Sequence, residues 1–516
     1  MDMTTKAKGN KNNSMGVVLA GLLLGILMAS MDNTIVATAM GTIIGELGGL
    51  DKFVWVTSAY MVAEMAGMPI FGKLSDMYGR KRFFVFGIIV FMFGSILCGT
   101  ADSIVELSIY RAIQGIGAGA MVPTAFTIMF DVVPPQDRGK LGGLFGAVFG
   151  LSSIFGPLLG AYITDYIHWE WIFYINLPLG AIAFVLVAFF YKESAIHTKQ
   201  KIDWVGAATL VGGIVALMFA LELGGKEYAW DSVQIIGLFA AFAVLTLVFI
   251  FVERRAEEPI ITFGMFKQRL YASSNLIAIL SGAAFITASV YIPIYVQGVL
   301  GGKATNSGLL LLPMMVGSVV TASLGGIFLN RFKFRTIMVP TLAILVVGMG
   351  LLATLNPDTP RWMITIMMIL VGLGIGASFS VLSNAAIHSF SARQRGSATS
   401  TLNFLRSLGM TLGITVFGII QSHLFSSKLS KAFAESDMGA MPEGMSSDVR
   451  ELLSEEGRKA IPPQVLETIT DTLSSSIVTT FTWAIIPAVL ALIASFAMGG
   501  EKMDPNAEEG EYSAAH

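Results

Sequence analysis

Long apolar runs recur along the whole chain, and short polar segments separate them. Each run has about 20 predominantly apolar residues, which is enough for a helix to cross a bilayer. The runs predict fourteen membrane-spanning helices, at 15–39, 53–71, 83–101, 105–130, 141–164, 171–191, 203–222, 232–252, 271–297, 305–329, 336–354, 362–387, 397–422 and 477–498. A barrel would instead show alternating segments of about 10 residues. The pattern therefore predicts an all-α polytopic membrane protein.

Composition agrees with this class. The chain has 516 residues, of which 54% are hydrophobic and 13% are charged, whereas soluble domains have about 25% charged residues. The net charge of −2 shows no basic excess, so we expect no nucleic-acid partner. Cys98 is the single cysteine, which excludes a disulfide framework. The first apolar run is too long for a signal-peptide core, so we treat it as the first helix.

Lys and Arg residues are distributed unequally between the two sets of loops. The loops assigned to the cytoplasmic side hold 22 of them, and the short outer loops hold only Lys52, Lys226, Lys303 and Arg361. Short loops rich in Lys and Arg stay in the cytoplasm. We therefore expect a plasma-membrane protein with both termini, 1–14 and 499–516, in the cytoplasm.

One outer loop, 423–476, is long and polar. Ser446 or Ser447 is a candidate cap for a short helix that ends at Arg458, and Pro462 and Pro463 are candidates to begin another that continues into the last span. Two interpretations remain open: a flexible surface loop, or a hairpin lid over the outer mouth.

The stretch Gly72–Arg82 lies between the second and third spans and combines two glycines, one carboxylate and four cations. Glycine permits a very short turn, and we expect Asp76 near the start of the next helix, whose partial positive end favours an anion. The stretch resembles the loop between helices 2 and 3 of major facilitator superfamily transporters. The resemblance implies that Gly72, Asp76, Gly79 and Arg80 form a gate that closes the cytoplasmic side.

A weak internal repeat supports the same family. The segment 326–335 resembles a decayed copy of 72–81, with Asn330 at the place of Asp76. In this superfamily two related six-helix halves are usual. The resemblance predicts the major facilitator fold, with a six-helix bundle at 15–191, a linker with two inserted helices at 192–270, and a second six-helix bundle at 271–498. Only some branches have the inserted pair, chiefly the fourteen-helix drug:proton antiporters.

Three charged residues stand out inside the predicted spans of the first half, where charges are costly and usually face a partner or a water-filled path. From a rise of roughly 1.5 Å per residue, Asp32 and Arg111 lie about 10 and about 9 Å below the outer helix ends, and Glu64 lies about 16 Å below. Asp32 and Arg111 are thus at matched depth. A nearby arginine favours the ionised carboxylate and burial disfavours it, so such a carboxylate can exchange a proton against a cationic substrate. The alternatives are an ion pair that only fixes helix packing, and a Glu64 without a direct role.

The family signatures cover these positions. The segment 31–36 resembles the helix 1 signature of the fourteen-helix antiporters, and 107–119 resembles the helix 4 signature, whose arginine the family implicates in proton transfer. Gly156, Pro157 and Gly160 resemble the helix 5 motif of exporters, which symporters generally lack. Proline kinks a helix, so the motif is a candidate hinge. Intramembrane charge and the resemblance together predict the proton-coupling residues: Asp32 is the first candidate, Glu64 is the second from its charge alone, and Arg111 tunes Asp32.

The substrate-binding candidates are polar, aromatic or adaptable side chains within the spans. Aromatic faces attract organic cations, and methionine is common at promiscuous surfaces. The candidates are Met28, Tyr60, Gln114, Phe285, Tyr291, Tyr295, Asn403 and Arg406.

Together these features predict a monomeric proton-coupled exporter of structurally varied, hydrophobic and often cationic drugs. The chain carries no phosphate-binding lysine motif, no metal-ligand spacing among its five histidines and no nucleophile–base arrangement, so we expect no enzyme activity, cofactor or metal. Three alternatives remain open: an exporter of one antibiotic or metabolite, a proton-driven importer, and a membrane sensor without transport.

Overall fold

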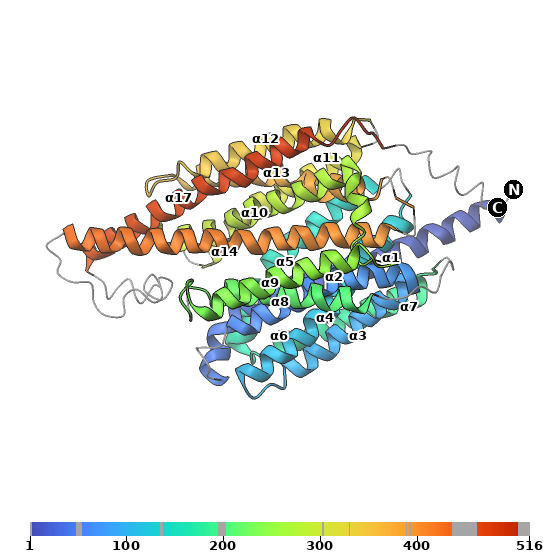
Figure 1. Ribbon diagram of the computed structural model, residues 1–516, viewed down its shortest axis with the longest axis horizontal. Helices are drawn as coiled ribbons and strands as arrows, with labels where there is room; N and C mark the ends of the chain where they lie inside the picture. The colour runs from blue at the N-terminus through green and yellow to red at the C-terminus, as the bar shows by residue number, and fades with distance from the viewer. Residues whose placement is uncertain are drawn as a thin grey trace. The chain divides into compact units, whose positions relative to one another are not determined.

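The computed structural model describes residues 3–47, 54–134, 138–193 and 203–503, apart from 226, 258, 302–303, 330, 389, 392–393 and 436–461. These residues form helices joined by short connections (Figure 1), and within them no strand occurs beyond two isolated bridges. The elements are α1 (Met3–Leu47), α2 (Val54–Tyr78), α3 (Arg80–Cys98), α4 (Ile104–Val132), α5 (Arg138–Tyr166), α6 (Trp171–Tyr174), α7 (Asn176–Phe190), α8 (Trp204–Leu223), α9 (Val233–Glu253), η2 (Phe263–Lys267), α10 (Arg269–Gly298), α11 (Ala304–Phe328), α12 (Phe334–Leu352), α13 (Arg361–Ile387), α14 (Arg395–Glu435) and α17 (Pro463–Phe496).

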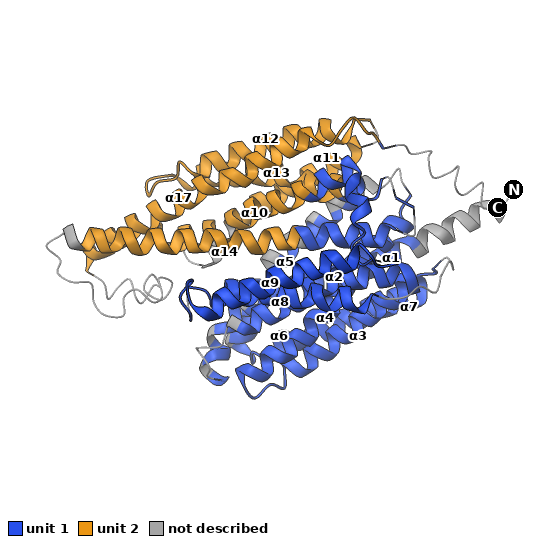
Figure 2. Ribbon diagram, viewed as in Figure 1, with its two compact units in different colours: residues 1–275, 383–405, 503–516 blue, residues 276–382, 406–502 orange. Residues whose placement is uncertain are grey.

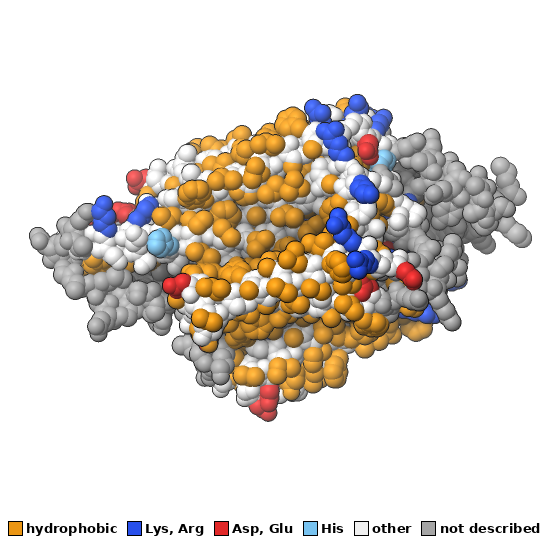
Figure 3. Space-filling view, in the orientation of Figure 1, with side chains coloured by type: hydrophobic (Ala, Val, Ile, Leu, Met, Phe, Trp, Pro, Cys, Tyr) orange, Lys and Arg blue, Asp and Glu red, His pale blue; other side chains and the backbone are white. Residues whose placement is uncertain are grey.

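A helix lies at each of the fourteen predicted spans. Among the described residues, twelve helices are long and apolar enough to cross a membrane, and α2 and α5 fall outside this group. On the face drawn in Figure 3, apolar side chains cover the helices along their length and charged side chains gather near helix ends. The chain is therefore a multi-pass membrane protein.

Several predicted boundaries were wrong. α2 does not end at residue 71 but continues to Tyr78, so Gly72 and Asp76 are helical and only Gly79, with φ 109°, interrupts the chain. α14 continues beyond 422 to Glu435, and α17 begins at Pro463, so much of the predicted loop 423–476 is helical. The predicted short helix beginning at Ser446 or Ser447 lies outside the described residues, as does Asn330. The sixth predicted span is divided into α6 and α7 at Ile175.

The chain divides into two compact units (Figure 2). Unit 1 comprises 1–275, 383–405 and 503–516, and unit 2 comprises 276–382 and 406–502. In unit 1, α4 packs against α2 and α3, α1 packs against α5 and α7, and α8 packs against α9 and α2. In unit 2, α12 packs against α17. Close helix contacts in unit 2 are made at glycines, since a Cβ at Gly372 would collide with the backbone of Met314 in α11.

Candidate functional site

α4 carries Arg111, and its start is fixed by a reciprocal cap. The Ser103 hydroxyl accepts the Glu106 N–H at 3.2 Å, and the Glu106 carboxylate accepts the Asp102 N–H at 3.1 Å. This capping box satisfies free N–H groups of the first turn. Further along α4, a Cβ at Gly115 would collide with the Tyr60 carbonyl oxygen, and one at Gly119 would lie 2.6 Å from that of Glu64. Small residues therefore let α2 approach α4 closely.

Arg111 and Asp32 form an ion pair in which both side chains are fully buried. The same carboxylate accepts hydrogen bonds from Gln114 Nε2 and Asn176 Nδ2, each at 2.8 Å. Gln114 also accepts a hydrogen bond from Arg111 at 2.5 Å. Asp32 thus has three donors from α4 and α7, so its charge is compensated without water.

The guanidinium of Arg111 is held on its other sides as well. Its Nε donates to the Val56 carbonyl oxygen at 3.2 Å, and its carbon lies 4.2 Å from the centre of the Tyr60 ring. Its second terminal nitrogen is buried and has no hydrogen-bond partner among the described residues. This arrangement fixes the arginine yet leaves one donor available.

Glu64 differs from Asp32 in its surroundings. It lies on α2 one turn beyond Tyr60 and is half-buried. Among the described residues, no hydrogen bond or ion pair reaches its carboxylate. Arg111 and Asp32 are the two charges that act on it most strongly. The structure therefore separates the two acids: Asp32 is fully ligated and dry, and Glu64 is partly accessible.

Asn176 was missed as a site residue by the sequence analysis. It is the first residue of α7, directly after the break at Ile175. Besides Asp32, its amide contacts the Ser95 hydroxyl of α3 at 3.3 Å, and that hydroxyl accepts a hydrogen bond from Gln114 at 2.8 Å. The signal in the sequence was an asparagine two residues before Pro178 in an otherwise apolar run.

The substrate-binding candidates of unit 1 lie around this network. Met28 is fully buried, and its sulfur lies near Gly180 of α7. Tyr60 is fully buried beneath Arg111, and its hydroxyl reaches the Ala29 carbonyl oxygen at 3.4 Å. Gln114 is part of the ion-pair network. Asn403, on α14, is 7% exposed.

The candidates of unit 2 lie on α10 and α14. The Phe285 ring lies 6.2 Å from that of Phe379, and the Arg406 guanidinium carbon lies 5.0 Å from the centre of the same Phe379 ring. Arg406 also donates to the Ser378 carbonyl oxygen at 3.2 Å. Tyr291 and Tyr295 are buried, with the Tyr291 ring 6.4 Å from Phe481 and the Tyr295 hydroxyl 3.3 Å from Ser474.

Asp76 binds a helix start, as expected, but the helix is α14 and not α3. Its carboxylate accepts the backbone N–H groups of Gly396 at 3.1 Å and Ser397 at 2.7 Å, in the first turn of α14. Arg80 donates to it at 3.0 Å and also pairs with Asp131 of α4. Free N–H groups make a helix start favourable for an anion.

Asp76 lies beyond the predicted span 53–71. Burial and the neighbouring polar groups act in opposite directions on the ionisation of its carboxyl group. Burial raises the pKa of Asp76 above its usual value, against the Arg80 cation and the two backbone N–H groups, which lower it. Gly72 lets α2 lie close to α14, because a Cβ at this position would collide with the Ser400 side chain of α14. Gly72 and Asp76 therefore form a junction between α2 and α14, Arg80 of α3 joins it through Asp76, and Gly79 lies at the turn between α2 and α3.

A chain of hydrogen bonds extends from this junction to the inserted helices. The Ser397 hydroxyl donates to the Ile260 carbonyl oxygen at 3.3 Å, and the Ile260 N–H donates to the Glu253 carboxylate at 3.1 Å. Glu253 is the last residue of α9 and is 3% exposed. The connection between α9 and α10 is thus packed into unit 1, with Ile260, Ile261 and Met265 buried.

The exporter-type glycines of α5 pack against α1. A Cβ at Gly156 would collide with the Thr34 hydroxyl, and one at Gly160 would collide with that of Thr38. The Thr34 hydroxyl also contacts the Ser152 carbonyl oxygen at 3.0 Å. Pro157 lies inside the helix between these contacts.

Among the described residues, no group of three or more His, Cys, Asp or Glu side chains is placed to hold a metal ion. The polar clusters of unit 1 are instead built from ion pairs, amides and backbone groups.

Comparison with known proteins agrees with this geometry. The family model of the Major Facilitator Superfamily matches residues 22–206 and 204–414. Multidrug resistance protein 3 of Bacillus subtilis is 53% identical over 510 residues, which cover 98% of this chain and 99% of that protein. Multidrug transporter protein MdtP of the same organism is 36% identical over 485 residues, covering 91% of this chain and 90% of that protein.

A solved structure of the proton:xylose symporter XylE shares the fold, with a TM-score of 0.60 at 13% identity, covering 96% of this chain and 98% of that chain. The family model spans most of the chain. The chain therefore belongs to the Major Facilitator Superfamily and is a transporter, not an enzyme.

Proposed function

We propose that this transporter exports several hydrophobic, often cationic compounds across the plasma membrane in exchange for protons. The observation that carries the proposal is the cluster of Asp32, Arg111 and Glu64 inside an apolar bundle. The 53% identity to a protein named for multidrug resistance, over almost the whole chain, supports the substrate class. The positive-inside distribution of Lys and Arg supports cytoplasmic termini.

Within this proposal the two acids have different roles. Glu64 is partly accessible and has no fixed partner among the described residues, so it exchanges the proton with water or with a cationic substrate. Asp32 holds Arg111, and the charge of Arg111 sets how readily Glu64 ionises. A cation that enters beside Glu64 favours the ionised form and drives proton release.

The junction of Asp76 with the first turn of α14 supports a cytoplasmic gate. Opening on that side separates α14 from α2 and breaks the bonds of Asp76 to Gly396 and Ser397. The α5 glycines allow close sliding contact with α1 around Pro157. One chain supplies the acids, the arginine and the gate, so we take the monomer as the working unit.

The test is drug-driven proton release by the purified protein, together with dye transport in inverted vesicles. We expect Glu64→Gln to abolish proton release while drug binding remains. The matched control is Glu106→Gln, at the exposed start of α4, which should release protons normally. Unchanged release in Glu64→Gln would reject the coupling role, and uptake in the opposite direction would identify an importer. Transport of one compound among chemically unlike dyes would identify a narrow exporter.

A further inference from the structure

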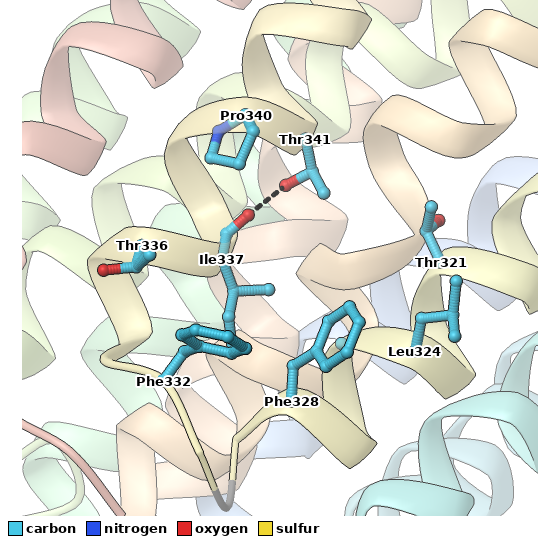
Figure 4. A pocket seen from close by; sticks show the side chains of 9 residues that line it. Thr321, Leu324, Phe328, Phe332, Thr336, Ile337, Pro340 and Thr341 are labelled. Carbon is cyan, nitrogen blue, oxygen red and sulfur yellow. Dashed lines mark hydrogen bonds between the residues drawn. The ribbon is translucent and has the colours of Figure 1, made fainter.

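An apolar groove lies on unit 2 where α11 and α12 join (Figure 4). It has a volume of about 360 Å³ and is lined on the α11 side by Leu324 and Phe328, on the connection by Phe332, and on the α12 side by Ile337 and Pro340. Leu324, Phe328 and Phe332 are 43%, 40% and 47% exposed. On a membrane-spanning hairpin such side chains face lipid.

Two of the three threonine hydroxyls that line the groove are bonded within their own helices. The Thr341 hydroxyl donates to the Ile337 carbonyl oxygen at 3.1 Å, as Figure 4 shows, and the Thr321 hydroxyl donates to the Gly317 carbonyl oxygen at 3.1 Å. These threonines therefore offer no free donor to a polar ligand. The groove suits a hydrocarbon chain.

Cations bracket the groove at its turn end. Arg331 and Lys333 flank Phe332, and Arg335 precedes the lining residue Thr336. All three are exposed, and neither Arg331 nor Lys333 forms an ion pair with a described residue. Arg335 lies over the Phe496 ring at 5.5 Å. Figure 3 shows Lys and Arg side chains gathered at this end of the hairpin, beside an apolar surface.

The acid of the first copy of the sequence repeat is missing from the second. In the first copy, Arg80 is neutralised inside the protein by Asp76 and Asp131. In the second copy, Asn330 stands at the position of Asp76, and Arg331 and Lys333 stand at the positions of the uncharged Met77 and Gly79, so this copy has lost the acid and gained two cations. Glu501, which contributes its backbone oxygen to the Phe334 N–H, is exposed.

We propose that this groove binds one acyl chain of an anionic phospholipid, whose phosphate is held by Arg331 and Lys333. Arg and Lys recognise phosphate through charge-assisted hydrogen bonds. An apolar groove that ends at two exposed cations, neither paired with a described acid, matches the order of chain and head group in such a lipid. The site is separate from the proton-coupling cluster and does not depend on the proposed transport function.

The test is lipid retention by the full-length protein, measured by native mass spectrometry from detergent micelles. The micelles contain equal amounts of phosphatidylglycerol and phosphatidylcholine with identical acyl chains. We expect the unaltered protein to retain phosphatidylglycerol preferentially. Arg331→Gln with Lys333→Gln should lower that retention roughly 25-fold, since each of the two cations near an anionic lipid contributes on the order of fivefold. Thr336→Trp should lower retention of both lipids by filling the groove.

The matched control is Arg254→Gln with Arg255→Gln, which removes two exposed cations after α9 without touching the groove. Phosphatidylglycerol retention should stay at the level of the unaltered protein. Equal losses in the two double variants would show general surface attraction and overturn the site. Equal retention of the two lipids would overturn head-group recognition. If phosphatidylglycerol is retained only after deletion of the acidic residues 504–516, those acids pair with Arg331 and Lys333 in the full-length protein. That result would overturn the lipid site.

Discussion

Removal of one partner of the Asp32–Arg111 pair should destabilise unit 1 strongly. Both side chains are fully buried, and Asp32→Asn leaves the arginine without a counter-charge while Gln114 and Asn176 keep a neutral acceptor. Breaking a buried pair in this way costs about 3–5 kcal/mol, chiefly because a buried charge stays uncompensated. Since a domain of 150–250 residues shifts by about 2–4 °C per kcal/mol, the apparent melting temperature should fall on the order of 10 °C.

The double variant tests the cause of this loss. Asp32→Asn with Arg111→Gln removes both charges, so the destabilisation should be smaller than the sum of the two single losses by about 1–3 kcal/mol. Glu64→Gln is the control, because no described residue bonds to that carboxylate, and it should melt close to the unaltered protein.

The chain offers a convenient probe for this measurement. Cys98 is the only cysteine and is fully buried, so a thiol-reactive dye reports unfolding during a thermal ramp. Its sulfur lies 3.7 Å from Gln114, so tryptophan fluorescence should be recorded in parallel to separate local opening from global unfolding. If Asp32→Asn melts like the unaltered protein, Asp32 is already neutral in the folded state, and the role of a fixed counter-ion is wrong.

Three further tests address the proposed gate and the α1–α5 contact. Gly156→Ala should reduce dye transport because its Cβ collides with Thr34, Thr34→Ala should restore part of the activity, and Gly237→Ala on α9, where no atom lies within 4 Å, should have no effect. Gly79→Ala should lower the melting temperature through about 1–3 kcal/mol of backbone strain at φ 109°, whereas Gly350→Ala should not. Ser397→Ala keeps the N–H that Asp76 accepts but removes the hydroxyl bond to Ile260, so it should weaken the attachment of the first turn of α14 by about 0.5–1.5 kcal/mol. Asp76→Asn should weaken this attachment more, because it removes the charged acceptor of two N–H groups; labelling of Ser400→Cys in a Cys98→Ser background should rise in that order, and equal labelling in all variants would contradict the gate.

Helix rise alone placed Asp32 and Arg111 at the same depth, and the structure brings them into contact. This worked because a membrane-spanning helix converts sequence distance into depth almost without ambiguity. The same argument placed Glu64 deeper, but it gave no indication that its carboxylate has no partner among the described residues. The exposure of the Glu64 side chain depends on which helices pack against α2. Distance along the sequence does not determine that packing.

The partners of Asp76 show the limit more clearly. An anion near a helix start was a sound physical expectation, and the nearest helix in sequence, α3, was the natural choice. The structure selects α14, more than 300 residues away, because α2 continues through Gly72 and carries Asp76 past the turn. Asn176 was missed for a related reason: its amide is placed by the break between α6 and α7, which the apolar pattern of that span did not predict.

The helix pair α8 and α9 is bound to its neighbours at two places, which argues against a passive spacer. Near the start of α2, the Ser58 hydroxyl contacts Glu222 of α8 at 3.2 Å, and the Trp55 ring lies 4.3 Å from the Phe219 ring. Beyond the other end of the pair, the Glu253 carboxylate accepts the Ile260 N–H, and the Ile260 carbonyl oxygen accepts the hydroxyl of Ser397 in α14. Ser397 therefore bonds both to the Asp76 carboxylate, through its N–H, and to the connection after α9, through its hydroxyl. If the proposed gate opens by moving α14 away from both partners, the two bonds are lost together, and we expect the pair to add to the barrier for that movement.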